Sequence, residues 1–248
     1  MDVIRTRLAR GAREARGLVV VIDVFRAFSC APFLFHFGVR KVVLEADPEK
    51  AIALRSEHPD WILMGEVNEV PIQGGDLSNS PSEILQKGEA FFRGKTVVHR
   101  TTAGVTGVAA ALEGAEEVLL GGLLTARATA RYIRERAPDR VALVAMGSRG
   151  REPAPEDEAC AEYLEHLLTG RPHSPVAALR DILFQATARK FLYRERPYLP
   201  PEDPVLCLQR DLFDFVLAAE RESTSDAVVV VERTGASWLT PTRTPESC

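Results

Sequence analysis

The 248-residue sequence lacks the features that mark several classes of protein. No apolar run approaches the roughly 20 residues that a membrane helix needs, and the best candidate is interrupted by Asp23. Four cysteines (Cys30, Cys160, Cys207 and Cys248) show no CxxC spacing, which disfavours a zinc site. A net charge of -4 gives no basic excess for binding nucleic acid. We therefore expect no membrane and no nucleic-acid partner.

Several enzyme motifs are also missing. There is no Gly-Lys-Ser/Thr of a Walker loop, no Gly-x-Gly-x-x-Gly after a strand and no Gly-x-Ser-x-Gly elbow. The Asp-x-Asp signature of the haloacid dehalogenases is absent, because Phe25 stands two residues after Asp23. The basic segment 1–17 has no apolar core like that of a signal peptide, so we interpret it as a solvated lead-in and expect a cytoplasmic protein.

Short apolar runs alternate with helical segments along most of the chain. The first run, 18–22, has the composition of a strand buried on both faces. This alternation predicts an α/β fold of three layers, α/β/α, with a mostly parallel sheet. We expect a single domain, a helix from Ser174 to about Arg189, and a proline-rich lid or linker that starts the C-terminal part, 197–248. That part ends in a hairpin whose second strand is 227–231, and residues from 243 on are expected to fray.

An internal repeat supports the same architecture. A strand, a polar loop, a short helix and a second strand follow Gly17, and the same order follows Gly94. The glycines that precede the two strands are 21 residues apart in the first copy (Gly17 and Gly38) and 20 in the second (Gly94 and Gly114). We interpret residues of about 17–60 and 94–136 as copies of one duplicated unit.

Four polar clusters follow predicted strands. If the strands are parallel, their carboxyl ends share an edge of the sheet, which is where open α/β sheets bind ligands. The clusters are Asp23/Arg26/Ser29; Glu66 with the loop to Asp76, Asn79 and Ser80; Arg100/Thr101/Thr102/Ala103/Gly104 with Thr106; and Ser148/Arg149 with Glu156, Asp157 and Glu158.

Two kinds of chemistry fit these clusters. Hydroxyls and a glycine at the start of a helix suit an anion, although Thr101 and Thr102 could equally well only cap that helix. The carboxylates suit a hard divalent cation that keeps some of its waters. Acidic residues are also favoured in the first turn of any helix, so a purely structural role remains open for Glu156–Glu158. For Asp23, which follows a buried strand, we favour a functional role, and for His99 a structural one over that of a general acid.

Six motifs follow one another in order between about residues 18 and 215. They are Val21-Ile-Asp-Val-Phe-Arg-Ala-Phe-Ser29, Gly65-Glu66, Gly75-Asp-Leu-Ser-Asn-Ser-Pro81, Gly94-Lys-Thr-Val-Val-His-Arg-Thr-Thr102, Gly147-Ser-Arg-Gly150 with Glu156-Asp157, and Cys207-Leu-Gln-Arg-Asp-Leu-Phe-Asp214. This ordered set resembles the 2-phosphosulfolactate phosphatase family. The resemblance implies a layered α/β fold and a Mg²⁺-dependent phosphatase that acts on a small anionic phosphoester. In that family the reaction belongs, in some organisms, to coenzyme M biosynthesis.

This chain departs from the family pattern at two places. The family's Gly-Glu-Arg-Gly-Gly is Gly65-Glu-Val-Asn-Glu69 here, which removes an arginine. Its Thr-Thr-Asn-Gly-Thr-Arg is Thr101-Thr-Ala-Gly-Val-Thr106, which removes an asparagine and an arginine. Each loss removes a donor for an anionic substrate.

Two hypotheses follow from the residues and the resemblance. In the first, the protein hydrolyses a phosphomonoester: Asp23 and Arg26 act in catalysis, and Asp23, Glu66, Glu156 and Asp157 hold Mg²⁺. The anion is bound by Ser29, Thr101, Thr102, Gly104, Ser148 and Arg149. In the second, the protein is catalytically degenerate and only binds a phosphate or sulfonate. The sequence leaves open whether a homodimer forms, whether attack is by water or through a covalent intermediate, and whether Asp76, Asp211 and Asp214 reach the site.

Overall fold

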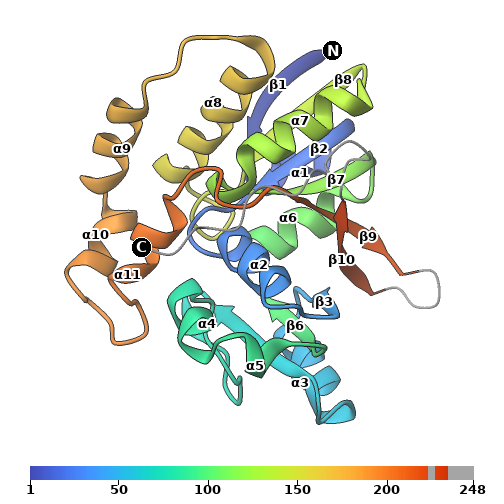
Figure 1. Cartoon of the computed structure of the whole chain (residues 1–248), viewed down its shortest axis with the longest axis vertical. Helices are drawn as coiled ribbons and strands as arrows, with labels where there is room; N and C mark the ends of the chain where they lie inside the picture. The colour runs from blue at the N-terminus through green and yellow to red at the C-terminus, as the bar shows by residue number, and fades with distance from the viewer. Residues whose placement is uncertain (223–226, 234–248) are drawn as a thin grey trace, which may run out of the picture.

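The apolar runs of the sequence form the strands of one ten-stranded sheet with helices on both faces (Figure 1). The computed structural model describes residues 1–222 and 227–233. The strands are β1 (Asp2–Arg7), β2 (Gly17–Ile22), β3 (Lys41–Leu44), β4 (Ile62–Val67), β5 (Val70–Pro71), β6 (Thr96–Arg100), β7 (Ala115–Gly121), β8 (Arg140–Ala145), β9 (Val216–Arg221) and β10 (Val228–Arg233). The helices are α1 (Leu8–Glu14), α2 (Ala27–His36), α3 (Pro48–Glu57), α4 (Pro81–Lys87), α5 (Glu89–Phe92), α6 (Gly104–Ala111), α7 (Ala126–Arg136), α8 (Pro155–Thr169), α9 (Pro175–Leu183), α10 (Ala186–Leu192), α11 (Glu202–Cys207) and a 3₁₀ helix at Leu123–Thr125.

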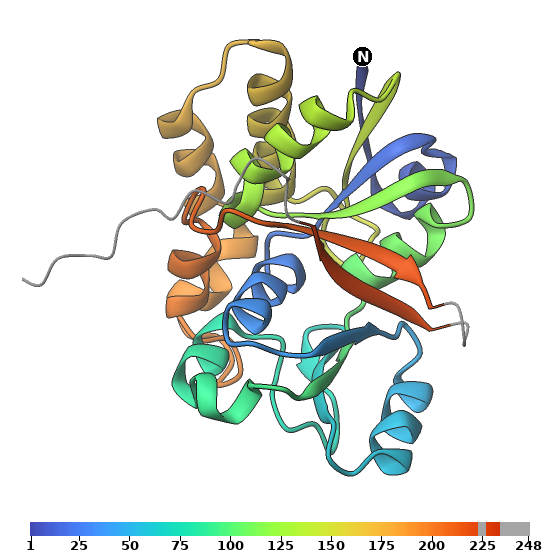
Figure 2. The ribbon, with the colours of Figure 1, turned by 45° about the vertical axis from the view of Figure 1, so that its right-hand side comes forward.

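The sheet consists of two parallel groups joined by an antiparallel hairpin. Its strand order is β1-β8-β2-β7-β9-β10-β3-β6-β4-β5. Strands β1, β8, β2 and β7 form the first parallel group, and β3, β6 and β4 form the second. The hairpin β9–β10 lies between them and pairs antiparallel with β7 on one side and β3 on the other (Figure 2). Three antiparallel steps separate the groups, so their strands run in opposite directions.

Alternation along β2 explains the three layers. Val19 and Val21 pack with α1, α2 and α6 in one cluster, while Leu18, Val20 and Ile22 pack with α7 and α8 in the other. Side chains of a strand alternate between its faces, so a strand with no polar residue is buried on both. The predicted three-layer α/β/α fold with a mostly parallel sheet is therefore confirmed. Among the described residues, no helix is long and apolar enough to cross a membrane.

Two strand–helix–strand connections cross between the groups in opposite senses. The first runs from β2 through α2 to β3, and the second runs from β6 through α6 to β7. These segments are the copies inferred from the glycine spacing, and their duplication stays a prediction. The crossing brings the loop after β2 next to the start of α6, where the amide of Gly104 donates to Asp23.

The structure differs from the predictions at the N-terminal segment and at the helix predicted from Ser174. Residues 2–7, expected to be a solvated lead-in, form edge strand β1, which pairs with β8 through its backbone and so needs no apolar run. The single helix expected from Ser174 to Arg189 is divided into α9 and α10 by a turn at Phe184–Gln185. The expected fraying from residue 243 lies outside the described residues.

Candidate active site

A pocket lies where the carboxyl ends of strands from both groups meet. The expectation that the clusters share one edge of a parallel sheet was wrong in detail, because the two groups run in opposite directions. The twist that accumulates across the sheet allows these ends to converge. The cavity volume of the pocket is small, about 50 Å³. The predicted site residues that line it are Asp23, Arg26, Glu66, Thr102, Ser148, Arg149, Glu156 and Asp157.

Asp23 is the buried carboxylate that directly follows β2. Its Oδ2 accepts a hydrogen bond of 2.7 Å from the amide of Gly104, the first residue of α6. Burial raises the pKa of Asp23 to about 7, repulsion from Glu66 acts in the same direction, and the amides of Gly104 and Ala27 oppose both. Asp23 is therefore a carboxyl group that changes protonation near neutral pH, or that a bound cation would keep ionised.

The Asp157 carboxylate joins the loops that follow two neighbouring strands. Its Oδ1 accepts from the amide of Val24 after β2, and its Oδ2 accepts from the amide of Gly147 after β8, both at 2.7 Å. Burial and the charges of Asp23 and Glu156 raise its pKa well above the ordinary value. Asp157 thus fixes the position of the pocket wall and is more than a favourable residue at the start of α8.

Glu66 and Thr102 connect the carboxyl end of β4 to the loop that follows β6. The Glu66 carboxylate accepts from the amide of Thr102, from its hydroxyl at 3.0 Å and from the amide of Glu69. The Thr102 hydroxyl and amide are therefore bound to a carboxylate. Thr102 was predicted to bind the substrate anion. In the structure it lines the pocket, and its amide and hydroxyl donate to Glu66.

The segment that contains α10 contributes cations and hydroxyls that sequence reasoning did not identify. The Thr187 hydroxyl donates to Glu156 at 2.9 Å, and Lys190 donates to Glu69 at 2.7 Å. Burial raises the pKa of Glu156, and the Thr187 hydroxyl and Lys190 oppose that shift. Arg149 lies 4.0 Å from Glu69, from the opposite wall. Two cations thus flank one carboxylate in the pocket.

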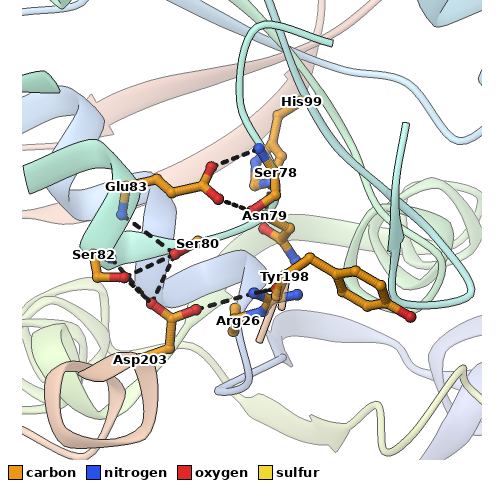
Figure 3. Close-up of polar contacts among 9 residues, drawn as sticks. All are labelled: Arg26, Ser78, Asn79, Ser80, Ser82, Glu83, His99, Tyr198 and Asp203. Atoms are coloured by element: carbon orange, nitrogen blue, oxygen red, sulfur yellow. Dashed lines mark hydrogen bonds and ion pairs between the residues drawn. The ribbon is translucent and has the colours of Figure 1, made fainter. Parts of the chain in front are cut away.

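The Arg26 side chain is held in a buried ion pair. Its Nη1 lies 3.0 Å from Asp203 of α11 and donates to the carbonyl oxygen of Tyr198 at 3.3 Å (Figure 3). Its guanidinium carbon also lies 5.2 Å from the centre of the Phe191 ring. The predicted catalytic arginine therefore reaches the pocket wall with part of its guanidinium already bound to Asp203.

Three residues predicted to bind the anion are not among the pocket-lining residues of the described chain. The Ser29 hydroxyl is buried and donates to the carbonyl oxygen of Val24 at 2.8 Å. The Thr101 hydroxyl accepts from the amide of Val105, which is the capping role left open above. The Gly104 amide is bound to Asp23, and a Cβ at this position would lie 2.7 Å from Asp23 Oδ2. These residues shape the pocket without lining it.

The other undecided carboxylates have structural partners. Asp76 accepts from the amide of Leu63 at 2.9 Å, and Asp211 accepts from the amide of Arg127 at 2.8 Å. Asp214 pairs with Arg131. None of the three aspartates is among the described residues that line the pocket.

The pocket's carboxylates are the side chains that could hold a divalent cation. Within residues 1–222 and 227–233, no three Asp, Glu, His or Cys side chains are arranged to hold a metal ion. Magnesium commonly takes only one or two carboxylates and completes its shell with waters and substrate phosphate. The mutual repulsion that raises the pKa of Asp23 beside Glu66 is what such a cation would relieve.

Several residues of the site have no recognisable signal in the sequence. Thr187 lies near the end of a predicted helix, Lys190 just beyond that end, and Asp203 among the prolines of the predicted lid or linker. Only tertiary contacts bring these side chains to the pocket or to Arg26. Asn79, which lines the pocket, belongs to a cluster noted from the sequence without an assigned role. His99 lies beneath Asn79, fully buried, and burial lowers its pKa to about 4.

Comparison with known proteins identifies one group of relatives. A family profile described as 2-phosphosulpholactate phosphatase matches residues 5–222. A protein of Bacillus subtilis named probable 2-phosphosulfolactate phosphatase is 31% identical over 205 residues, which cover 82% of this chain and 87% of the relative. Relatives with the same name from Deinococcus radiodurans and Caldanaerobacter subterraneus are 35% and 38% identical over 151 and 135 residues. Those two matches span 62% and 54% of the relatives' lengths, and 61% and 54% of this chain.

Proposed function

The chain belongs to the 2-phosphosulpholactate phosphatase family, and we propose that it hydrolyses a small anionic phosphomonoester such as 2-phospho-3-sulfolactate. The observation that carries the proposal is the convergence of Asp23, Glu66 and Glu156 with Lys190 and Arg149 in one pocket. Carboxylates able to hold a cation, next to side chains able to hold an anion, are the parts that phosphoryl transfer needs.

Asp23 and Glu66 are the residues we assign to Mg²⁺, with Glu156 completing the acidic side of the pocket. Mg²⁺ bound there would polarise a phosphoryl oxygen as a Lewis acid. Asp157 was also predicted as a ligand and stays a candidate, because its oxygens accept backbone amides just as both oxygens of Glu66 do. It also holds the loops after β2 and β8 in place.

The chain's own groups account for the remaining requirements of hydrolysis. Arg26, kept in place by Asp203, presents positive charge in the pocket wall, and Lys190 and Arg149 add to it. Asp23 has a pKa close to neutrality and can accept a proton from an attacking water or stay ionised beside a cation. Phe25, Phe191 and Leu199 form the apolar part of the pocket wall.

The substrate assignment rests on the names of the relatives and on the charge of the pocket. Three positions where the family pattern has an arginine or an asparagine are Val67, Ala103 and Thr106 here. Lys190 and Arg149 carry positive charge in the same pocket and could bind the acidic groups of a sulfolactate phosphate in their place.

The proposal is tested by phosphate release from a panel of small phosphomonoesters that includes 2-phospho-3-sulfolactate. We expect turnover with millimolar Mg²⁺ and a loss of at least about 100-fold in excess EDTA, because the carboxylates alone leave the phosphoryl charge uncompensated. Full activity in EDTA would contradict the assignment of Mg²⁺. No release from any ester, with or without Mg²⁺, would contradict hydrolysis itself.

The second candidate, a binding protein without catalysis, is favoured by the pairing of the pocket's cations. Arg26 is paired with Asp203, and Lys190 and Arg149 both face Glu69. This alternative predicts that phosphate or sulfonate compounds raise the melting temperature of the protein while no ester is hydrolysed. Slow hydrolysis of an aryl phosphate by the wild-type protein would exclude it.

A further inference from the structure

The Asn79 side chain lines the pocket and is hydrogen-bonded to a buried histidine. It stands two residues before α4, is 4% exposed, and belongs to the same pocket wall as Asp23 and Arg26. Its Oδ1 lies 2.9 Å from Nε2 of His99, a fully buried residue of β6 (Figure 3). Asn79 is thus one of the few uncharged polar groups in a pocket rich in carboxylates.

The contact with His99 determines the tautomer of the imidazole. An amide oxygen can only accept, so Nε2 must carry the proton and donate to Asn79 Oδ1. A neutral histidine has one N–H, which leaves Nδ1 bare, and Nδ1 has no partner among the described residues. Burial lowers the pKa of His99 to about 4, so the ring is neutral at physiological pH and this tautomer persists.

The opposite orientation of the Asn79 amide is disfavoured on two grounds. If Nδ2 faced His99, Nε2 would have to accept, and the ring N–H would lie at Nδ1 without an acceptor. A buried N–H without a partner is rarer and more costly than a bare acceptor. Oδ1 would then also face a pocket that already contains Asp23, Glu66 and Glu156. The observed orientation avoids both penalties.

The loop that carries Asn79 is braced on either side. On one side, Glu83 accepts from the amide and the hydroxyl of Ser78, both at 2.8 Å (Figure 3). On the other side, Asp203 accepts from the hydroxyls of Ser80 and Ser82, both at 2.8 Å. Asp203 also binds Arg26. Asn79 is therefore fixed in backbone position by its neighbours and in side-chain orientation by His99.

The Nδ2 group of Asn79 is a donor that no group in the described chain accepts. With Oδ1 bound to His99, Nδ2 is the polar side-chain atom of Asn79 left for a ligand in the pocket that this residue lines. We propose that Asn79 binds the substrate by donating from Nδ2 to an oxygen of its phosphoryl group, and that His99 is a positioning residue that sets the direction of this donor. The proposal rests on the proposed phosphomonoester function, because it needs a phosphoryl group in the pocket. It adds one neutral donor to the cations already described.

The test measures binding of inorganic phosphate, the reaction product, by calorimetry and as competitive inhibition of hydrolysis. Asn79→Asp replaces the donor with an oxygen of nearly the same shape. It should weaken phosphate binding by about 10- to 100-fold, the range for a hydrogen bond to a charged group. Asn68→Asp is the matched control, because it adds the same charge on an exposed neighbouring loop. A folded Asn79→Asp protein with phosphate affinity within twofold of Asn68→Asp would overturn the proposal.

The role of His99 is tested by a pair of variants. His99→Gln keeps an N–H donor at about the position of Nε2, whereas His99→Leu removes it. We expect His99→Leu to raise KM and weaken phosphate binding about 10-fold with little change in melting temperature, and His99→Gln to restore most of the loss. Equal phosphate affinity in both variants would refute the positioning role.

Calorimetry separates this proposal from the proposed function. If the wild-type protein binds phosphate but hydrolyses no ester, the hydrolysis proposal fails and the Asn79 proposal is still decided by the binding data. If Asn79→Asp hydrolyses esters normally and binds phosphate normally, only the Asn79 proposal fails.

Discussion

At the scale of single residues, the central feature is a carboxylate kept where its charge is costly. Asp23 is buried beside Glu66, and its pKa is raised from an ordinary 3.8 to about 7. The folded protein therefore holds this proton more tightly than the unfolded chain does. By linkage, the contribution of Asp23 to stability is lost as pH rises from about 4 to about 7 in the absence of a cation.

The loss of stability with rising pH leads to a prediction for the metal-free protein. The stability of Asp23→Asn, which cannot ionise, should increase relative to wild type between pH 5 and pH 8, by on the order of 3 kcal/mol. Urea denaturation in EDTA across this pH range measures the difference. Millimolar Mg²⁺ should reduce it, because a cation stabilises only the ionised carboxylate. A difference that does not change with pH would show that Asp23 ionises in the fold without cost.

Single residues also show the limit of reading function from residue type. Asp23 and Glu66 could be predicted because they lie at the carboxyl ends of buried strands, Asp23 directly after β2 and Glu66 in the last residues of β4. The hydroxyls of Ser29 and Thr101 satisfied the same rule but bind the backbone of their own loops. The sequence shows which residues follow a predicted strand. It does not show whether a hydroxyl is already hydrogen-bonded to the backbone and so is not free to bind a ligand.

At the scale of secondary-structure elements, helix α10 joins the pocket to a part of the chain far away in sequence. Its Thr187 and Lys190 bind Glu156 and Glu69, and its Phe191 packs edge-on against Phe25, with ring centres 5.9 Å apart. A proline-rich lid or linker was predicted from residue 197, but the described contacts of this part of the chain with the pocket begin earlier, at Thr187. The predicted helix around Thr187 gave no reason to place it at the pocket, because these contacts depend on side chains far away in the sequence.

The cation on α10 gives a prediction at the level of this element. Lys190→Met keeps the aliphatic stem but removes a charge that lies in the pocket, so KM for a polyanionic ester should rise about 10-fold with a smaller change in kcat. Arg189→Met is the matched control, since Arg189 is exposed and adjacent. Steady-state kinetics at two ionic strengths measure both. An equal change in the two variants would point to a general effect of net charge and contradict a specific role for Lys190.

At the scale of the whole molecule, the layered fold followed directly from the sequence, but the relation between its halves did not. Runs such as 18–22 predicted buried strands, and the structure contains them. The opposite direction of the two parallel groups depends on hairpin β9–β10, which inserts between β7 and β3. Strand order is a property of long-range pairing, and no local pattern encodes it. The duplication, the single-domain organisation, a homodimer and a cytoplasmic location stay predictions.

The proposed phosphatase activity requires the Asp23 carboxylate. The most direct measurement is phosphate release from 2-phospho-3-sulfolactate and an aryl phosphate by wild type and Asp23→Asn, at pH 7 with Mg²⁺. Because the variant keeps an oxygen for the Gly104 amide, its fold should persist while its rate falls by about 1,000-fold or more. A folded Asp23→Asn protein that retains more than a tenth of the wild-type rate would contradict the account.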